Sequence, residues 1–244
     1  MTDKRCVVVT GAASGLGKSI ATAFAQNGDF VFVADIDGDA AHAVAEALGG
    51  RAVQMDIADA ASVQEAASAI FEHSGRVDVL INNAGIVGGR GSVVDLDLEV
   101  LRRALTVNVL GTWTVTQAIG RKMQARKAGT IINITSIGAR QPTPEMGHYE
   151  ASKAAIEAIT RTTAIEMAPF GIRANAIAPG PVVTPMTQRL VENPDARAAW
   201  EARIPLGTIA EVDQIAPAAL FLASAAASHI TGTSLTIDGG QLLK

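Results

Sequence analysis

The sequence predicts an α/β fold with a doubly wound parallel sheet of seven strands, covered by helices on both faces. Three observations support this fold class. Short runs rich in β-branched residues alternate with longer stretches whose apolar residues recur at helical spacing. The short runs are almost wholly apolar, which is typical of parallel strands buried on both faces. The alternation has no break that marks a domain boundary, so we expect one domain over residues 1–244.

The individual elements follow from the same alternation. Seven apolar runs predict strands, which are Cys6–Val9, Phe30–Val33, Ala52–Met55, Val77–Ile81, Thr130–Ile134, Ile172–Ile177 and Ser234–Ile237. Five stretches between them predict helices, at Leu16–Asn27, Ala40–Leu48, Ser62–His73, Leu98–Arg126 and Tyr149–Ala168. Gly28, Gly49 and Gly171 stand just past three of these stretches, where glycine commonly ends a helix.

One proline-rich segment, residues 179–205, interrupts the alternation and has a charged centre. So long an interruption in a compact domain is often a lid or a binding loop. The segment also follows the carboxyl end of a predicted strand, the edge at which open α/β sheets bind ligands. We therefore assign a substrate loop to about residues 181–205. A solvated surface excursion with a short helix is the alternative.

Composition narrows the function classes. The chain has 20 Lys and Arg against 24 Asp and Glu, a formal charge of −4, and no basic cluster, which argues against a nucleic-acid-binding surface. The single cysteine, Cys6, cannot form an intrachain disulfide, and no run approaches the roughly 18 apolar residues of a membrane span. The polar start of the chain does not resemble a secretory signal. We expect a cytoplasmic protein with no membrane partner and no metal site, whose partner is a small molecule or another protein.

The segment Thr10–Gly17 directly follows the first predicted strand and precedes a helix. Its glycines at positions 11, 15 and 17 allow a tight turn and a close approach of the backbone to a pyrophosphate. Free N–H groups at the start of the next helix favour the same anion. An ordinary strand-to-helix turn also uses glycines, so the surrounding residues decide what this turn indicates.

Acidic and amide residues end the next three predicted strands. Asp35 follows Gly17 by 18 residues, close to the roughly 20 at which an acidic side chain accepts hydrogen bonds from an adenosine ribose. A helix cap or turn aspartate is the alternative there. Asp56 would touch the adenine edge, or cap the helix that begins after Asp59. Asn82–Gly85 would line the same crevice or form a turn.

A possible acid/base pair begins the last long helix. Tyr149 and Lys153 are four residues apart, so their side chains share one helix face, and Ser136 precedes Tyr149 by 13 residues. A neighbouring ammonium stabilises the phenolate and lowers the pKa of a tyrosine, which makes it a general acid/base. Without further context, a tyrosine and a lysine at this spacing are more often a half-buried ring and a solvent-exposed amine with no catalytic role.

Taken together, the motifs resemble those of the short-chain dehydrogenase/reductase family, in its shorter single-domain form, along essentially the whole chain. The matching segments are Thr10–Gly17, Asn82–Gly85, Asn108 within Thr106–Val109, Ser136 with Tyr149 and Lys153, Pro179–Gly180 with Thr184, and Ile237–Gly240. The resemblance implies a three-layer Rossmann fold and usually a homotetramer, packed through the two long predicted helices. Hydride transfer would belong to the cofactor, and the protein would supply orientation and a tuned acid/base.

The resemblance also implies four catalytic residues. Tyr149 would exchange a proton with the substrate oxygen while hydride passes to or from nicotinamide. Ser136 would hydrogen-bond the same oxygen, so Ser136 and Tyr149 are also the substrate-contacting residues. Lys153 would hold the ribose hydroxyls and lower the pKa of Tyr149. Asn108 would keep a bridging water in the proton path.

The cofactor is predicted to be NAD. Family members that use NADP tend to have a basic residue before the second glycine of the turn or directly after the second strand, and these positions hold Ser14 and Ile36. Asp35 adds a negative charge where the 2′-phosphate of NADP would lie. The residues assigned to the cofactor are Gly11, Ser14, Gly15, Leu16, Gly17, Asp35, Ile36, Asp56, Ile57, Asn83, Ala84, Gly85, Tyr149, Lys153, Pro179, Gly180, Val182 and Thr184.

The predicted substrate is a secondary alcohol, polyol or sugar, because an NAD preference suits alcohol oxidation. Residues 138–148 and the loop after Thr184 should form the pocket, in which Arg140 or His148 would bind an anionic or polyhydroxy substrate or face solvent. A hydroxysteroid is an alternative substrate. A 3-oxoacyl-thioester reductase or 3-hydroxyacyl dehydrogenase is an alternative enzyme activity. A non-catalytic dinucleotide sensor is the alternative of another class. Such a sensor is expected to lack an acid/base residue, and all four are present.

Overall fold

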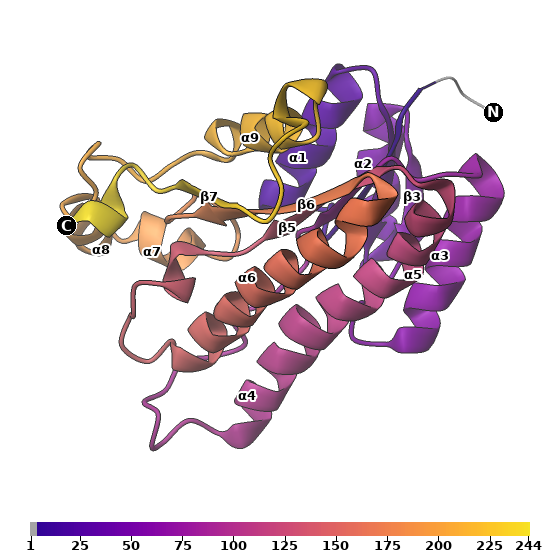
Figure 1. Cartoon of the computed structure of the whole chain (residues 1–244). Helices are drawn as coiled ribbons and strands as arrows, with labels where there is room; N and C mark the ends of the chain where they lie inside the picture. The colour runs from indigo at the N-terminus through magenta and orange to yellow at the C-terminus, as the bar shows by residue number, and fades with distance from the viewer. Residues whose placement is uncertain (1–3) are drawn as a thin grey trace.

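The computed structural model describes residues 4–244, and its strands form one parallel sheet in the order β3-β2-β1-β4-β5-β6-β7. The strands are β1 (Cys6–Thr10), β2 (Phe30–Asp35), β3 (Arg51–Gln54), β4 (Val79–Asn82), β5 (Gly129–Ile134), β6 (Ile172–Pro179) and β7 (Ser234–Ile237). Each strand lies within two residues of its predicted bounds at both ends. Figure 1 shows the sheet between two layers of helices, so the three-layer Rossmann fold is confirmed.

The strand order determines where a ligand can bind. From β1 the chain adds β2 and β3 on one side, and it then returns to add β4 to β7 on the other side. β1 and β4 are therefore neighbours, paired from Val7 with Val79 to Val9 with Ile81. The chain leaves these two strands in opposite directions, which opens a crevice at their carboxyl ends.

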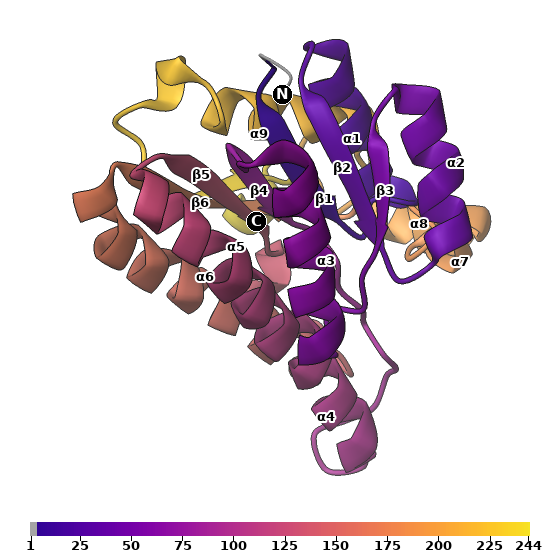
Figure 2. The same cartoon turned by 90° about the vertical axis from the view of Figure 1, so that its right-hand side faces the viewer.

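Two groups of helices cover the sheet. The helices are α1 (Gly15–Gln26), α2 (Gly38–Leu48), α3 (Ala60–Ser74), α4 (Leu98–Leu105), α5 (Thr112–Arg126), α6 (Gly147–Met167), α7 (Gln188–Glu192), α8 (Pro194–Glu201) and α9 (Ala216–Leu222). α1, α2 and α9 pack on one face, and α3, α5 and α6 pack on the other (Figure 2). Within residues 4–244, no helix combines the length and the apolar character needed to cross a membrane.

Successive residues of β1 contribute to opposite faces of the sheet. Val7 and Val9 belong to the core that includes Phe24 of α1, whereas Val8 belongs to the core that includes Ile119 of α5. All five side chains are fully buried. Burying a side chain of this size contributes about 1.5–3 kcal/mol. Because both faces are covered, the strands need apolar residues at every position.

One predicted helix is divided in the structure, and one further helix was not predicted. The stretch predicted as one helix over Leu98–Arg126 is divided into α4 and α5 by a π-helical segment, Thr106–Gly111, and such segments often occur at functional sites. α9 was not predicted, because a seven-residue helix is too short to display a clear helical period.

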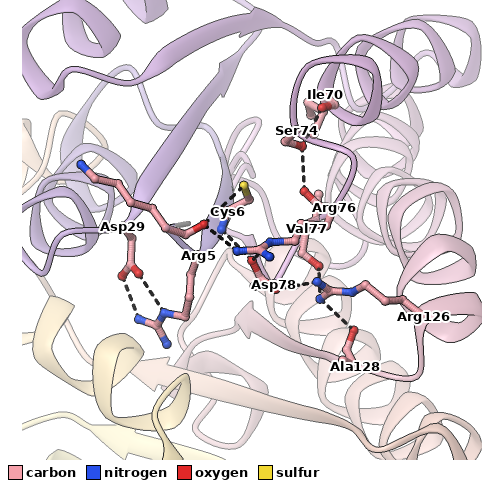
Figure 3. A network of polar contacts seen from close by, with 11 residues as sticks. Arg5, Cys6, Asp29, Ile70, Ser74, Arg76, Val77, Asp78, Arg126 and Ala128 are labelled. Carbon is pink, nitrogen blue, oxygen red and sulfur yellow. Dashed lines mark hydrogen bonds and ion pairs between the residues drawn. The ribbon is translucent and has the colours of Figure 1, made fainter. Parts of the chain in front are cut away.

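A network of polar contacts joins the sheet and its helices at the amino ends of the strands, opposite the crevice (Figure 3). Asp78, directly before β4, accepts hydrogen bonds from the backbone N–H of Cys6 at 2.7 Å and from the Arg126 guanidinium at 2.7 Å. Arg5 pairs with both carboxylate oxygens of Asp29, each at 2.8 Å. The contacts connect β1 with β4 and α5 far from the candidate site.

Candidate active site

The glycine-containing turn after β1 has the geometry that the sequence predicts. Gly11 and Gly15 adopt φ angles of 62° and 51°, in the left-handed region that favours glycine. A Cβ on Gly17 would clash with the carbonyl oxygen of Gly11 and the side-chain amide of Asn83. That amide donates to the carbonyls of Thr10 and Gly11, at 2.9 and 3.0 Å. The turn is therefore held tightly against the end of β4.

The first turn of α1 has the donors that a pyrophosphate needs. Ser14 is the N-cap residue, yet its side chain makes no capping hydrogen bond, and the first turn contains no acidic residue. The backbone N–H groups of Gly15, Leu16 and Gly17 lie at this helix start, where no intrahelical partner exists for them. The helix dipole favours an anion at the same place. These residues fit the diphosphate of a dinucleotide.

Asp35 lies beside this turn at the end of β2. One carboxylate oxygen accepts a hydrogen bond from the backbone N–H of Ala13 at 2.9 Å, and the other accepts from the N–H of Asp37 at 3.1 Å. The cap of α2 is Asp37, so the helix-cap alternative for Asp35 does not hold, although Asp35 does also stabilise the local turn. Ile36 is 61% exposed next to it. The Asp35 carboxylate is thus fixed next to the predicted ribose position.

Asp56 lies in the loop between β3 and α3. One of its oxygens accepts from the backbone N–H of Ala58 at 2.9 Å, and the N-cap of α3 is Asp59. Asp56 therefore stabilises a turn and does not cap the helix. The next residue, Ile57, is buried and packs where a Cβ on Gly111 would lie. The adenine contact of Asp56 and Ile57 stays a prediction.

The segment after β4 connects the turn with the predicted catalytic residues. The Thr10 hydroxyl accepts hydrogen bonds from the N–H groups of Asn83 and Ala84, at 3.0 and 3.1 Å. A Cβ on Gly85 would lie 3.4 Å from the Lys153 ammonium nitrogen. The backbone from Asn83 to Gly85 thus spans the distance between the phosphate end and the catalytic end of the crevice.

Ser136, Tyr149 and Lys153 come together as predicted. Ser136 follows β5, and its hydroxyl lies within hydrogen-bond reach of the Tyr149 hydroxyl. Lys153, one helical turn after Tyr149 on α6, is buried and donates to the carbonyl of Ile134 at 2.9 Å. This brings a hydroxyl donor, a phenol and an amine to the carboxyl end of β5.

The direction of the tyrosine pKa differs from the expectation. Burial raises the pKa of Tyr149, and the hydrogen bond with Ser136 only partly offsets this, because a phenolate loses more hydration than the serine replaces. Burial also lowers the pKa of Lys153 to about 8. Both groups thus favour their neutral forms, and the expected lowering of the Tyr149 pKa by Lys153 is not found in this structure.

Asn108 holds the backbone of the site in place. Its side-chain oxygen accepts from the N–H of Ile86 at 2.8 Å, and its amide nitrogen donates to the Ile86 carbonyl at 2.8 Å and to the Ser152 hydroxyl at 2.9 Å. The Ser152 hydroxyl in turn donates to the Tyr149 carbonyl at 2.6 Å. Both amide hydrogens of Asn108 are therefore engaged by the protein, and its part in holding a water stays a prediction.

The segment predicted to meet the nicotinamide half begins where β6 ends, at Pro179. Gly180 donates its N–H to Ile237 at the end of β7, at 2.9 Å, and Val182 is buried. Thr184 lies against the glycine turn, since a Cβ on Gly15 would be 3.6 Å from the Thr184 Cβ. The structure thus places this segment across the crevice from the start of α1.

The predicted substrate loop is partly helical, because it contains α7 and α8. Its first half forms a pocket of about 380 Å³, lined by Val183, Thr184, Pro185, Gln188, Val191 and Glu192. The pocket adjoins the segment that faces the glycine turn. The segment thus contains short helices and a cavity next to the crevice, and its role as a substrate loop stays a prediction.

Arg140 and His148 are committed to other contacts. Arg140 pairs with Glu157 at 2.8 Å and donates to the Thr236 hydroxyl at 3.0 Å. His148 is buried, and one of its ring nitrogens lies 2.9 Å from the carbonyl of Val87. The polar groups of both side chains therefore contact neighbouring parts of the protein, and their predicted binding of substrate stays untested. No sequence motif marked these pairings, because the partners lie far apart along the chain.

Known proteins are similar to this chain over nearly its whole length. Residues 11–241 match the family described as Enoyl-(Acyl carrier protein) reductase. D-threitol dehydrogenase of Mycolicibacterium smegmatis is 38% identical and covers 99% of this chain and 94% of its own length. Galactitol 2-dehydrogenase (L-tagatose-forming) of Cereibacter sphaeroides is 40% identical, with coverage of 98% and 95%.

A solved structure shows that the similarity extends to the fold. The crystal structure of a gluconate 5-dehydrogenase from Burkholderia cenocepacia, in complex with NADP and tartrate, superimposes with a TM-score of 0.95. It is 30% identical and covers 100% of this chain and 97% of the other. Together with the glycine turn and the Ser136, Tyr149 and Lys153 cluster, these matches show that the chain belongs to the short-chain dehydrogenase/reductase family, whose members are oxidoreductases that use a nicotinamide dinucleotide.

Proposed function

We propose that this protein oxidises a secondary alcohol of a small polyol or sugar to the ketone, with NAD as the hydride acceptor. The observation that carries the proposal is the meeting of Ser136, Tyr149 and Lys153 at one end of the crevice, with a free helix start at its other end. The threitol and galactitol dehydrogenases, at 38% and 40% identity, support the choice of a polyol.

In the proposed reaction, bound NAD supplies the acceptor for hydride, and the protein moves the proton. Tyr149 in its phenolate form takes the proton of the substrate hydroxyl and becomes the neutral phenol, and Ser136 donates a hydrogen bond to the same oxygen. Lys153 lies one turn along α6, where it would hold the ribose hydroxyls of the cofactor; it is not among the causes that shift the pKa of Tyr149. Asn108 keeps the start of α6 in position, because its amide connects Ile86 with Ser152.

The NAD preference follows from the position of Asp35. Its carboxylate is fixed by Ala13 and Asp37 beside the glycine turn, so it cannot easily turn away from a ribose phosphate. Neither Ser14 nor Ile36 offers a positive charge there. A 2′-phosphate would therefore meet a fixed negative charge without a compensating cation from these positions.

We also propose that four copies assemble through α5 and α6. Leu110, Trp113 and Ile165, on the π-helical segment, α5 and α6, are 60%, 51% and 77% exposed. Large apolar side chains at such exposure favour an interface.

The function is tested by following absorbance of reduced nicotinamide during incubation with NAD and a panel of alcohols. The panel contains D-threitol, galactitol, 2-butanol, a 3-hydroxyacyl thioester and a hydroxysteroid. We expect turnover of the polyols, and its loss in Tyr149→Phe. Turnover of the thioester or steroid alone would replace the proposed substrate class. Tight binding of NADH without turnover of any alcohol or ketone would indicate a dinucleotide sensor and contradict the proposal.

A further inference from the structure

Two glutamines from distant parts of the chain meet at the end of the helical turn that follows Ser136. Gln141 lies five residues after Ser136, and Gln241 begins the helical turn Gln241–Leu243 near the carboxyl end of the chain. The side-chain nitrogen of Gln241 donates to the side-chain oxygen of Gln141 at 2.8 Å. Gln241 is only 2% exposed.

The position of Gln141 is fixed relative to Ser136. Its backbone N–H donates to the carbonyl of Ile137 at 2.9 Å, so the chain after Ser136 makes a single helical turn. Arg140 anchors the same turn through Glu157 of α6 and Thr236 of β7. The Gln141 side chain therefore starts from a rigid backbone next to the oxygen-binding serine.

The segment that carries Gln241 contacts the other parts of the crevice. A Cβ on Gly180, in the segment predicted to meet nicotinamide, would lie 2.9 Å from the Cα of Asp238. A Cβ on Gly239 would lie 2.6 Å from the side chain of Ile204, at the end of the substrate loop. Figure 1 shows the carboxyl end of the chain beside α8 of that loop. Gln241 thus lies where the serine turn, the nicotinamide segment and the substrate loop converge.

The hydrogen bond between the two side-chain amides leaves one acceptor and one donor group without a partner. The side-chain oxygen of Gln241 is buried and has no hydrogen-bond partner in the described part of the chain. The side-chain nitrogen of Gln141 makes none of the hydrogen bonds found within residues 4–244, and two N–H groups remain on it. If both side-chain amides are rotated by about 180°, Gln141 becomes the donor and Gln241 the acceptor. One oxygen and one NH₂ group are again left without a partner in the pair. A buried acceptor without a donor is unfavourable, so a donor from outside the chain has to complete it.

We propose that Gln141 and Gln241 together bind a substrate hydroxyl other than the one that is oxidised, and so select polyhydroxy substrates. A hydroxyl donates one hydrogen bond and accepts another, which matches the oxygen and the N–H groups that the pair offers. Neither glutamine is charged, and the adjacent Arg140 is already paired with Glu157, so the site suits a neutral polyol better than an anion. This inference rests on the proposed function.

The test compares D-threitol with 2-butanol, which has the same number of carbons and lacks the additional hydroxyls. We expect Gln141→Leu and Gln241→Leu each to lower the ratio of kcat/KM for D-threitol to kcat/KM for 2-butanol by about 10-fold. The double variant should lose little more than either single variant, because the two amides act as a unit. Gln64→Leu, at an exposed position of α3, is the control and should leave the ratio unchanged.

The outcomes separate this inference from the proposed function. The wild type could oxidise D-threitol while the variants keep the wild-type ratio of kcat/KM for D-threitol to kcat/KM for 2-butanol. In that case a buried water satisfies the amides, and the glutamine pair has no part in substrate selection. If the wild type oxidises 2-butanol but no polyol, both the substrate class and the glutamine site are wrong. Thermal unfolding of Gln141→Leu, whose side chain is only half-buried, checks that a changed ratio does not reflect a loss of folding.

Discussion

The ammonium nitrogen of Lys153 lies 5.7 Å from the centre of the Tyr149 ring, one turn further along α6, and it donates to the carbonyl of Ile134. Burial moves the two pKa values in opposite directions, upward for Tyr149 and downward for Lys153. Each shift favours the uncharged form, because removal from water penalises a phenolate and an ammonium alike. The pair therefore bears on the proposed proton transfer and on the stability of the fold.

Tyr149→Phe should lower kcat by about 100- to 10,000-fold, which is the usual contribution of a general acid/base. Binding of NADH should change little, since the ring keeps its packing and only the hydroxyl is lost. Steady-state kinetics and a fluorescence titration with NADH measure the two effects. A variant that kept more than a tenth of the wild-type kcat would assign the proton transfer to another group.

Lys153→Met should change how stability depends on pH. The folded chain holds Lys153 with a pKa of about 8 against an ordinary value of 10.5, so the unfolded chain binds more protons between these pH values. Wild-type stability therefore gains with rising pH across this interval. Below pH 8 the buried ammonium destabilises the fold by about 3 kcal/mol, and methionine removes that penalty.

The expected result is that the free energy of unfolding of Lys153→Met, relative to wild type, is highest at pH 7 and declines towards pH 10. Urea unfolding of the cofactor-free protein at pH 7, 8, 9 and 10 measures it. Lys122→Met, at an exposed position of α5, is the matched control and should show no such slope. A relative stability that stayed constant or rose with pH would contradict the burial of a titrating amine.

Asp35→Ser combined with Ile36→Arg should reverse the cofactor preference. Two unit charges about 4 Å apart repel by about 4 kcal/mol at an effective dielectric near 20, and screening reduces this. We expect wild type to favour NAD by about 2–4 kcal/mol, or about 30- to 1,000-fold in kcat/KM. Asp35→Ser alone should only weaken the preference, because binding of the 2′-phosphate needs an attractive partner such as arginine.

The measurement is kcat/KM with NAD and with NADP for wild type, each single variant and the double variant. Asp37→Ser is a useful control, since Asp37 caps α2 next to Asp35. Equal use of both cofactors by the wild type, or an unchanged ratio in the double variant, would remove Asp35 from cofactor selection.

Asp78→Asn should destabilise the fold without altering the active site. The carboxylate of Asp78 pairs with Arg126 at 2.7 Å and with Arg76 at 3.2 Å, and its side chain is 19% exposed. Loss of its charge should lower the free energy of unfolding by about 1–2 kcal/mol. Glu99→Gln removes an exposed ion pair with Arg102 and should have a smaller effect. Equal effects of the two variants in thermal unfolding would contradict this role of the network in Figure 3.

Light scattering at micromolar concentration should give about four times the chain mass of 25.1 kDa. Trp113→Glu should lower that mass, because a charged side chain at a packed interface is unfavourable. Glu99→Gln, at an exposed position of α4, should not change it. A wild-type mass of one chain would exclude the proposed assembly.

The sequence by itself predicted the strands, most of the helices and the residues of the candidate site. The bounds of the strands, the glycines at 11, 15 and 17, and the shared helix face of Tyr149 and Lys153 all depend on neighbours a few residues away. Such local features follow from the geometry of strands and helices, so a single chain is enough to predict them. α9 and the π-helical segment were missed because neither has a distinctive local period.

Only the tertiary structure decided which groups meet and in what environment. It paired Arg140 with Glu157, brought Gln241 to Gln141 across 100 residues, and made Asp59 instead of Asp56 the cap of α3. It also set the direction of the Tyr149 pKa, since desolvation depends on what surrounds the ring. Such pairings and burial result from the order in which strands join the sheet, and no pattern along the chain specifies distances between residues so far apart.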